Sequence, residues 1–294
     1  MFLSAILPLT ALNASEQDTF LGREAHALFL SLVASASPGL ADKLHADEQR
    51  KPFTVSGLRR ATRYDVAPSS AEKMEEVNRS ARLAAIQPGQ SFTLRFTSVS
   101  PDLTAALLES VLPRLPETIR LGDAIFQTAA PITQSELHPW ACQSSAEELK
   151  TKWFAPTHAP PRQLELEFAS PTMIKQRGRF LVMPIPIVVF QSYLMAWNAC
   201  ASPAFEDDLL TLVERDVWVT RYHLRTRSLA MRGAGEGVDA ARASHQLGFL
   251  GRCAFTCFSP ERALWRTLHL LADFAFFCGT GYKTTQGMGQ TRKI

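Results

Sequence analysis

The chain has 294 residues, of which 46% are hydrophobic and 20% are charged. This composition excludes a disordered or fibrous chain, and the length suits two domains of ordinary size. The net charge is only +3 and the pI is about 8.6, so charge permits an anionic partner without requiring one. The positions of the cations along the chain must therefore decide whether the protein has an anionic partner.

The five cysteines form no C-x-x-C pair and leave an odd number. This pattern argues against a disulfide framework and a thiolate zinc site, and it fits a reducing cytosol. No basic residue precedes Arg23, so we expect no signal peptide. Prolines interrupt residues 180–201, the most hydrophobic stretch, which predicts a protein core and not a membrane span. We therefore expect a cytoplasmic protein with no membrane partner.

The first half of the chain shows the order β-α-β-β-α-β. The predicted elements are a strand at 2–12, helices at 20–35 and 39–50, strands at 51–58 and 91–99, a helix at 100–115 and a strand at 118–129. In the strand at 91–99, Phe92, Leu94 and Phe96 alternate with polar residues, which predicts one buried face. Ser100 is the expected N-cap of the next helix, with proline at its first position.

The second half repeats this order. Its predicted elements are a strand at 163–168, a helix at 186–201, strands at 216–231 and 247–258, a helix at 259–277 and a short final strand. FTSVSPD at 96–102 matches FTCFSPE at 255–261, each between a third strand and a second helix. We predict an α+β fold of two tandem ferredoxin-like (RRM-like) βαββαβ domains, 1–130 and 163–294, joined by a proline-rich linker at 131–162.

A glycine-rich loop, CGTGYKTTQGMGQ, occupies residues 278–290. Nucleotide-binding loops open a helix, whereas this loop follows one, so we expect no nucleotide cofactor. Successive amides of such a loop suit phosphate oxygens. The alternative is that the first two glycines only cap the helix, which leaves the last two unexplained. The phosphate-binding candidates are Gly279, Gly281, Lys283, Thr284, Thr285, Gly287 and Gly289.

The stretch FFCGTGYKTTQGMGQ resembles the C-terminal signature of the CRISPR precursor-RNA-processing endoribonucleases, which belong to the RAMP superfamily. Residues 168–198, 222–231 and 247–255 are similar to the blocks that precede this loop, and LADKLHADEQRKPFTVSGL resembles the N-terminal block. The resemblance implies CRISPR repeat RNA as the partner. It also implies metal-free cleavage by the ribose 2′-OH, which leaves a 2′,3′-cyclic phosphate and a 5′-OH.

Such a reaction needs a general acid or base with a pKa near neutrality, and histidine suits that role. His26 and His269 lie in apolar helical patterns and read as packing residues, and no two histidines stand at the metal-binding spacing i, i+4. By the resemblance, His45 falls at the catalytic histidine and Lys51 at the lysine that steadies phosphate charge. The alternative is that His45 is a solvated surface residue.

The catalytic centre of the family often includes a tyrosine on or near the first helix, and the stretch HALFLSLV has none. The catalytic residues that the resemblance implies here are therefore His45 and Lys51, without this tyrosine. His223 and His245 are the alternative candidates for the base.

Three groups of cations suit an RNA backbone. Arg221, His223, Arg225 and Arg227 recur with period two and contain no acid between them. Lys175, Arg177 and Arg179 alternate around a hairpin-like glycine, and Arg59, Arg60 and Arg63 form the third group. Binding through these residues would weaken steeply with salt. An RNP1-like motif is lacking, so we do not expect bases to stack on the sheet as they do in an RRM.

We interpret the sequence as a tandem ferredoxin-like endoribonuclease that binds and cuts CRISPR repeat RNA. Its rival is a non-catalytic RAMP subunit of a CRISPR effector complex, which would use the same loop and basic residues without cutting. A third reading is a cytosolic two-domain protein whose glycine loop is structural. The sequence leaves open whether the protein joins effector-complex subunits or forms a homodimer.

Overall fold

The computed structural model describes residues 1–16, 20–46, 50–61, 85–155, 160–202, 204–206, 208–231 and 244–294. Its contacts divide the chain into two compact units. The first comprises Met1–Gln143 with Thr285–Gly287, and the second comprises Ser144–Thr284 with Met288–Ile294. No helix among the described residues is long and apolar enough to cross a membrane.

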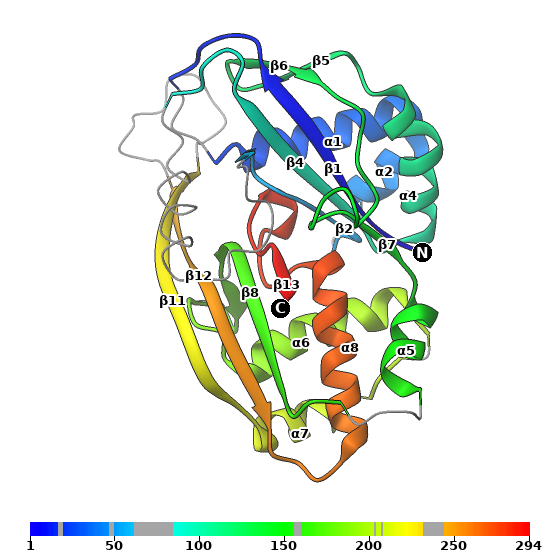
Figure 1. The fold of residues 1–294 in the computed structure, drawn as a ribbon, viewed down its shortest axis with the longest axis vertical. Coiled ribbons are helices and arrows are strands. Elements are labelled where there is room, and N and C mark those ends of the chain that lie inside the picture. The colour runs from blue at the N-terminus through cyan, green and yellow to red at the C-terminus, as the bar shows by residue number, and fades with distance from the viewer. Residues whose placement is uncertain are drawn as a thin grey trace. The chain divides into compact units, whose positions relative to one another are not determined.

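The first unit is an antiparallel sheet with helices packed on it (Figure 1). Its elements are β1 (Phe2–Ala11), α1 (Gly22–Ala36), α2 (Pro38–Ala46), β2 (Phe53–Val55), β3 (Arg59–Arg60), β4 (Ser91–Ser98), α4 (Pro101–Ala106) extended by η1 (Leu107–Val111) and η2 (Leu112–Arg114), β5 (Thr118–Leu121), β6 (Ala124–Thr128) and β7 (Cys142–Ser144). The strand order β2-β4-β1-β6-β5 places the first strand between the third and the last. This order confirms the predicted ferredoxin-like topology of this half.

Residues 118–129, predicted as one strand, form a hairpin. Strands β5 and β6 pair antiparallel, and Gly122 adopts φ 59° in the turn between them. Glycine reaches this left-handed conformation without the steric cost that a side chain imposes. The Gly-Asp step is therefore a turn signal that the apolar alternation on either side of it hid.

Strand β4, predicted to be half-buried, is buried on both faces from Leu94 to Ser98. Its helix-facing side packs Phe96 against Phe29 of α1, with ring centroids 5.1 Å apart. On the other side Arg95, only 4% exposed, donates from Nε to Ser4 Oγ at 2.8 Å and to the Trp140 carbonyl oxygen at 3.2 Å. Its guanidinium also lies 4.9 Å from the centroid of the Trp140 ring. Trp140 belongs to the predicted linker, which thus covers the second face of this sheet.

The second unit repeats the topology (Figure 1). Its elements are α5 (Ala146–Phe154), β8 (Gln163–Thr172), β9 (Ile174–Gln176), β10 (Arg179–Leu181), α6 (Pro186–Cys200), α7 (Asp208–Asp216), β11 (Val217–Met231), β12 (Ser244–Cys257), α8 (Arg262–Cys278) and β13 (Thr291–Lys293). The sheet order β11-β12-β8-β13 matches that of the first unit, while β9 and β10 form a separate hairpin. Helix α6 packs on one face of the sheet, where Phe190 meets Phe255 with centroids 5.7 Å apart.

Helix α5 also lies within the predicted linker. Ser145 begins it with a capping box, in which the Ser145 and Glu148 side chains each accept the other residue's backbone amide. At its last turn, the Trp153 ring stacks on His269 at 4.5 Å, and Trp153 Nε1 donates to Asp273 Oδ2 at 2.7 Å. These contacts bind α5 to α8, so the described part of the predicted linker belongs to the two units, residues 131–143 to the first and residues 144–155 to the second.

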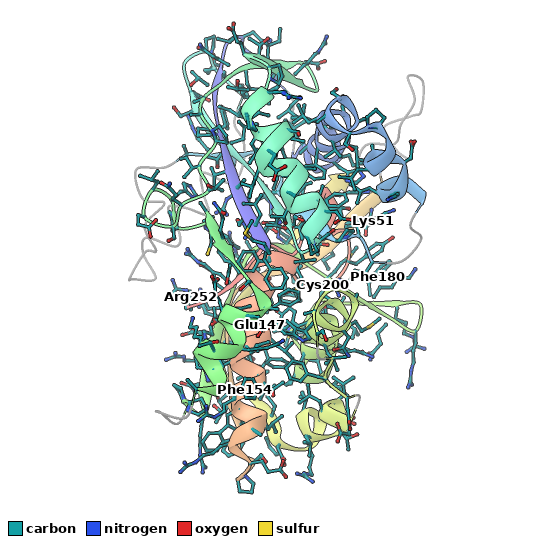
Figure 2. All side chains as sticks on the ribbon, turned by 90° about the vertical axis from the view of Figure 1, so that its right-hand side faces the viewer. Lys51, Glu147, Phe154, Phe180, Cys200 and Arg252 are labelled. Carbon is teal, nitrogen blue, oxygen red and sulfur yellow. The ribbon has the colours of Figure 1, made fainter. Side chains whose placement is uncertain are left out.

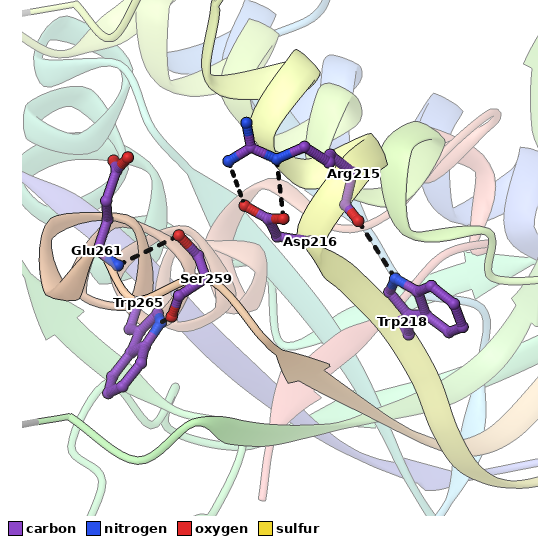
Figure 3. Close-up of polar contacts among 6 residues, drawn as sticks. All are labelled: Arg215, Asp216, Trp218, Ser259, Glu261 and Trp265. Atoms are coloured by element: carbon purple, nitrogen blue, oxygen red, sulfur yellow. Dashed lines mark hydrogen bonds and ion pairs between the residues drawn. The ribbon is translucent and has the colours of Figure 1, made fainter.

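The repeated FT-x-x-SP motif lies where predicted, at the β4–α4 and β12–α8 junctions. In the first, Ser100 Oγ accepts the Leu103 amide as an N-cap. In the second, Ser259 Oγ accepts the Glu261 amide at 3.2 Å, and its carbonyl oxygen accepts Trp265 Nε1 at 2.9 Å (Figure 3). The serine of the motif therefore has a different role in each unit. Ser100 is the N-cap of its helix, whereas Ser259 is tied to its helix by the hydrogen bond that its carbonyl oxygen accepts from Trp265.

Candidate nucleic-acid interface and catalytic residues

His45 lies in the last turn of α2, and its side chain is outside the described part of the structure. Lys51 follows shortly after in the chain and points back to this turn, where its Nζ donates to the Leu44 carbonyl oxygen at 2.5 Å (Figure 2). A cation at a helix C-terminus satisfies a carbonyl and offsets the negative end of the helix dipole. The fold thus brings Lys51 to the turn that carries His45.

A groove of about 550 Å³ runs between α1 and α2. Small and apolar side chains line most of it, and His26, Ser31 and Asp42 contribute polar groups. His26 also stacks on Phe53, with ring centroids 5.9 Å apart and an interplanar angle of 12°. The prediction that His26 packs is correct, but the same imidazole lines the groove beside α2. Sequence pattern gave no signal for this second placement, because the groove exists only once α2 folds back on α1.

All four glycines of the C-terminal loop have positive φ, at 65°, 82°, 92° and 71°. Their amides donate within the protein: Gly279 to Ala275 O, Gly281 to Ser192 Oγ, Gly287 to Val55 O and Gly289 to Pro171 O. A Cβ at Gly287 would also lie 2.5 Å from the Phe20 ring. The expectation that these amides face phosphate is therefore wrong. The glycines permit a tight chain path, and their donors are already used.

The rest of the loop is more accessible. Tyr282 is exposed, and the next four residues, including the short 3₁₀ turn η4 (Thr284–Gln286), are half-buried. Lys283 adopts φ 58°, which is uncommon for a residue with a side chain. Such strain persists where the surrounding structure enforces it, and it is often found at binding sites. Of the predicted loop residues, Lys283, Thr284 and Thr285 remain candidates for RNA contact.

The register of β11 with β12 places the predicted basic residues on one face. Arg221, His223, Arg225 and Arg227 lie opposite Ala254, Arg252, Leu250 and Gly248. The alternate residues of β12, among them Phe255, pack on the helices. Arg221, His223 and Arg225 are exposed and Arg227 is half-buried, so this basic face is the side of the sheet away from α6.

The basic face is not free of acids. Arg221 reaches across the small Ala254 to Glu165 on β8, with 3.0 Å between Nη2 and Oε2. Toward the other end, burial and the positive charge of Arg227 lower the pKa of Arg225. The face therefore has a compensated end at Arg221 and an electropositive end at Arg225 and Arg227, where a phosphate would relieve repulsion.

Lys175, Arg177 and Arg179 do not share one face. Arg177 and Gly178, with φ 47° and 76°, form a two-residue turn between β9 and β10. Lys175 pairs with Phe180, whereas Arg179 pairs with Gln176, so Lys175 and Arg179 lie on opposite sides of the hairpin. Gly178 lies in a hairpin turn, as predicted. The predicted alternation of basic residues is divided between two strands, with Lys175 on β9 and Arg179 on β10.

The third basic group lies on β3. The Arg59 guanidinium lies 5.6 Å from the centroid of the Trp140 ring, and Arg60 is exposed. Arg63 falls outside the described residues. Of this group, Arg60 is the residue whose described placement best suits a partner in solvent.

Comparison with known proteins gives one family for both halves. The profile described as the CRISPR Cas6 N-terminal domain matches residues 1–151, and that of the CRISPR-associated endoribonuclease Cas6 matches residues 166–291. The CRISPR-associated endoribonuclease Cas6 of Mycobacterium tuberculosis is 29% identical over 132 residues. This match covers 45% of the present chain and 38% of that relative, so the chain matches less than half of the relative's length.

Solved structures extend the likeness to the whole fold. A Cas6 product complex is 26% identical with a TM-score of 0.76, covering 100% of both chains. Thermus thermophilus Cas6 is 25% identical with a TM-score of 0.67, covering 100% of this chain and 99% of that one. Because the N-terminal profile alone covers more than half of the sequence and both units have the ferredoxin-like topology, this chain belongs to the Cas6 family.

Proposed function

We propose that this protein binds the repeat RNA of a CRISPR precursor transcript and cleaves it within the repeat. The observation that carries the proposal is the match of Cas6 profiles to both units, together with the similarity to a Cas6 product complex. The reaction is attack of a ribose 2′-oxygen on the adjacent phosphorus while the bond to the 5′-oxygen breaks. Its products are a 2′,3′-cyclic phosphate and a 5′-OH, and no metal takes part.

In this proposal His45 is the general base or acid. A base removes the 2′-OH proton, an acid delivers a proton to the leaving 5′-oxygen, and an imidazole can do either near neutral pH. Lys51 contributes positive charge for the phosphorane and fixes the end of α2 through the Leu44 carbonyl. An ammonium group has three donors, so one lysine can serve both the helix end and a phosphate oxygen.

RNA binding falls to the exposed cations and the accessible part of the C-terminal loop. The electropositive end of the basic face, Arg225 and Arg227, offers two guanidinium groups whose positive charges lie close to one another on one face of β11. The further contacts are Arg221, Lys175, Arg177, Arg179, Arg59, Arg60, Lys283, Thr284 and Thr285. Gly279, Gly281, Gly287 and Gly289 act through the loop shape that they permit.

Cleavage in the presence of EDTA tests this function. The protein is incubated with its repeat transcript and with a copy carrying a single 2′-deoxynucleotide at the mapped cleavage position. Cleavage of only the ribose substrate, with a 2′,3′-cyclic phosphate detected by mass spectrometry, supports the mechanism. Cleavage of the deoxy copy would rule out 2′-OH attack, and restoration of activity only by added Mg²⁺ would rule out the metal-free route.

The residue assignments need single-turnover kinetics. His45→Ala should slow cleavage by roughly 10²- to 10⁴-fold while leaving RNA affinity nearly unchanged. His223→Ala, which removes an alternative candidate for the base, is measured beside it and should retain the single-turnover cleavage rate at saturating protein. Normal cleavage by His45→Ala would show that the base lies elsewhere. Tight binding with no product from the wild-type protein would indicate the alternative, a non-catalytic RNA-binding subunit of an effector complex.

A further inference from the structure

Two exposed aromatic rings meet at the β9–β10 hairpin and the C-terminal loop. Phe180 on β10 is 50% exposed and Tyr282 is 38% exposed. Their ring centroids are 5.9 Å apart with an interplanar angle of 38°. Both rings lie in the second unit, and neither belongs to its four-stranded sheet. Large aromatic side chains that stay in solvent at this separation form a surface on which a flat apolar ligand can stack.

Two lysines flank this pair of rings. Lys175 Nζ lies 5.7 Å and Lys283 Nζ 5.9 Å from the centroid of the Tyr282 ring. Lys175 is also the cross-strand partner of Phe180, so the two side chains share one face of the hairpin. Among the ion pairs formed by described residues, none involves Lys175. The exposed aromatic surface is therefore bordered by positive charge.

The backbone holds both rings in place. The Tyr282 amide donates to the Met173 carbonyl oxygen at 2.8 Å, and the Gly281 amide donates to Ser192 Oγ at 3.2 Å. The two-residue turn at Arg177 and Gly178 fixes the hairpin that carries Phe180. A ligand would therefore meet rings whose supporting backbone is already ordered, which lowers the entropic cost of binding.

We propose that Phe180 and Tyr282 form a stacking platform for one unpaired nucleobase of the bound RNA, with Lys175 and Lys283 beside the adjoining phosphates. Stacking on an aromatic side chain suits any base, and cations at the ring edge suit the anionic backbone on either side of it. A protein partner would also cover exposed aromatics, but the two ammonium groups favour a polyanion. The proposal rests on RNA being the ligand, as in the proposed function, and adds that a specific base is unstacked from its neighbours.

A double-mutant cycle, in which one change removes a nucleobase and the other replaces an aromatic side chain, tests the platform. Binding of wild type, Tyr282→Leu, Tyr282→Phe and Phe180→Leu is measured at fixed salt with the repeat RNA made uncleavable by one 2′-deoxynucleotide. A parallel series of RNAs carries a single abasic site at each nucleotide in turn. One abasic position should weaken binding to the wild type about tenfold. Tyr282→Leu should weaken the intact RNA about as much and be insensitive to that abasic site, while Tyr282→Phe should behave like the wild type.

A second readout follows the base itself. 2-Aminopurine at the sensitive position should lose fluorescence on binding to the wild type and keep it on binding to Phe180→Leu. Equal affinity of Tyr282→Leu and the wild type for every RNA would overturn the platform and assign the aromatic pair to a protein partner. A uniform loss across the abasic series, without coupling to one position, would overturn it as well, because a folding defect has no preferred nucleotide.

The failure of the platform can be told from the failure of the proposed function. The function is read by cleavage of the ribose substrate by the wild-type protein, and the platform is read by binding of the uncleavable series. If the wild type cleaves the ribose substrate but no single abasic site weakens binding more than the others, only the platform is rejected. If one abasic site is coupled to the Tyr282 variant but the wild type does not cleave the ribose substrate, only the nuclease function is rejected and the platform is supported.

Discussion

The two units have the same strand order, but the sheet faces away from their helices differ. In the first unit this face is closed: Arg95 is buried beneath Trp140 and hydrogen-bonded to Ser4. On the corresponding face of the second unit, which we call the open face, β11 presents exposed arginines. An arginine on a ferredoxin-like sheet can therefore be part of the core or part of a binding surface. Whether another segment of the chain covers the arginine decides which of these two roles it has.

This difference extends to the buried titratable groups. The first unit buries a guanidinium, which keeps its charge at any pH that proteins tolerate. The second unit buries the imidazole of His269 between Trp153 and the Pro161 carbonyl. Removing or titrating these groups should affect stability, whereas changes on the open face should affect RNA binding. Four experiments test this division.

Acidification should give the largest effect, through the second unit. Burial lowers the pKa of His269 to about 4, although the hydrogen bond with the Pro161 carbonyl opposes this shift. The unfolded chain binds a proton near pH 6.5 and the folded chain only near pH 4, so stability is lost as pH falls through this window. At pH 4.5 the loss should reach roughly 2–3 kcal/mol relative to pH 7. Urea unfolding followed by tryptophan fluorescence measures it.

The control for acidification is His269→Phe, which keeps a ring to stack on Trp153 and removes the titrating group. Its stability should vary less between pH 7 and pH 4.5 than that of the wild type. His269 Nδ1 is buried with no hydrogen-bond partner among the described residues, which is why a proton there is costly. An unchanged pH dependence in the variant would mean that other groups cause the acid sensitivity.

Replacing the buried arginine of the first unit should have the next largest effect. Arg95→Leu leaves Ser4 Oγ and the Trp140 carbonyl oxygen without a donor that the wild type provides, and it removes the contact with the Trp140 ring. We expect a loss of about 2 kcal/mol in the free energy of unfolding, measured in urea. Arg221→Leu on the open face is the control and should lose less than about 0.5 kcal/mol. Similar losses for both would contradict the distinction between closed and open faces.

Removing the electropositive end of the open face should weaken RNA binding without destabilising the fold. The double variant Arg225→Ala, Arg227→Ala removes two cations, and we expect affinity for repeat RNA to fall about tenfold near 0.15 M salt. The slope of log K against log salt should fall by about 1.4 if each arginine neutralises one phosphate of a single strand. Filter binding or fluorescence anisotropy across a salt series measures both quantities.

A charge-matched variant separates a local contact from net charge. Arg114→Ala, Arg120→Ala removes two exposed cations from the first unit, outside the three basic groups. It should leave the salt slope almost unchanged. An equal change in slope for both variants would show that binding responds to total charge and not to the open face.

The sequence predicts the order of elements well, because alternation and helical periodicity are local properties of each segment. It predicts the shared face of the β11 arginines for the same reason. It does not predict that Arg95 is buried, since its cover, Trp140, lies 45 residues further along the chain. The glycine loop shows the same limit. The sequence shows that the loop is rich in glycine. It does not show which groups accept hydrogen bonds from the loop amides, because acceptors such as the carbonyl oxygens of Val55 and Pro171 come from distant segments.

The smallest effect concerns the acid that borders the open face. Glu165→Gln removes a negative charge and releases Arg221 from its pair, so affinity for repeat RNA should rise about twofold at low salt and less at high salt. Stability should change by less than about 0.5 kcal/mol, because the pair is partly exposed. Glu147→Gln on α5, whose carboxylate is 80% exposed, makes the same charge change away from the sheet (Figure 2). A gain confined to Glu165→Gln places the RNA backbone along the basic face, and equal gains in both variants would reduce the effect to net charge.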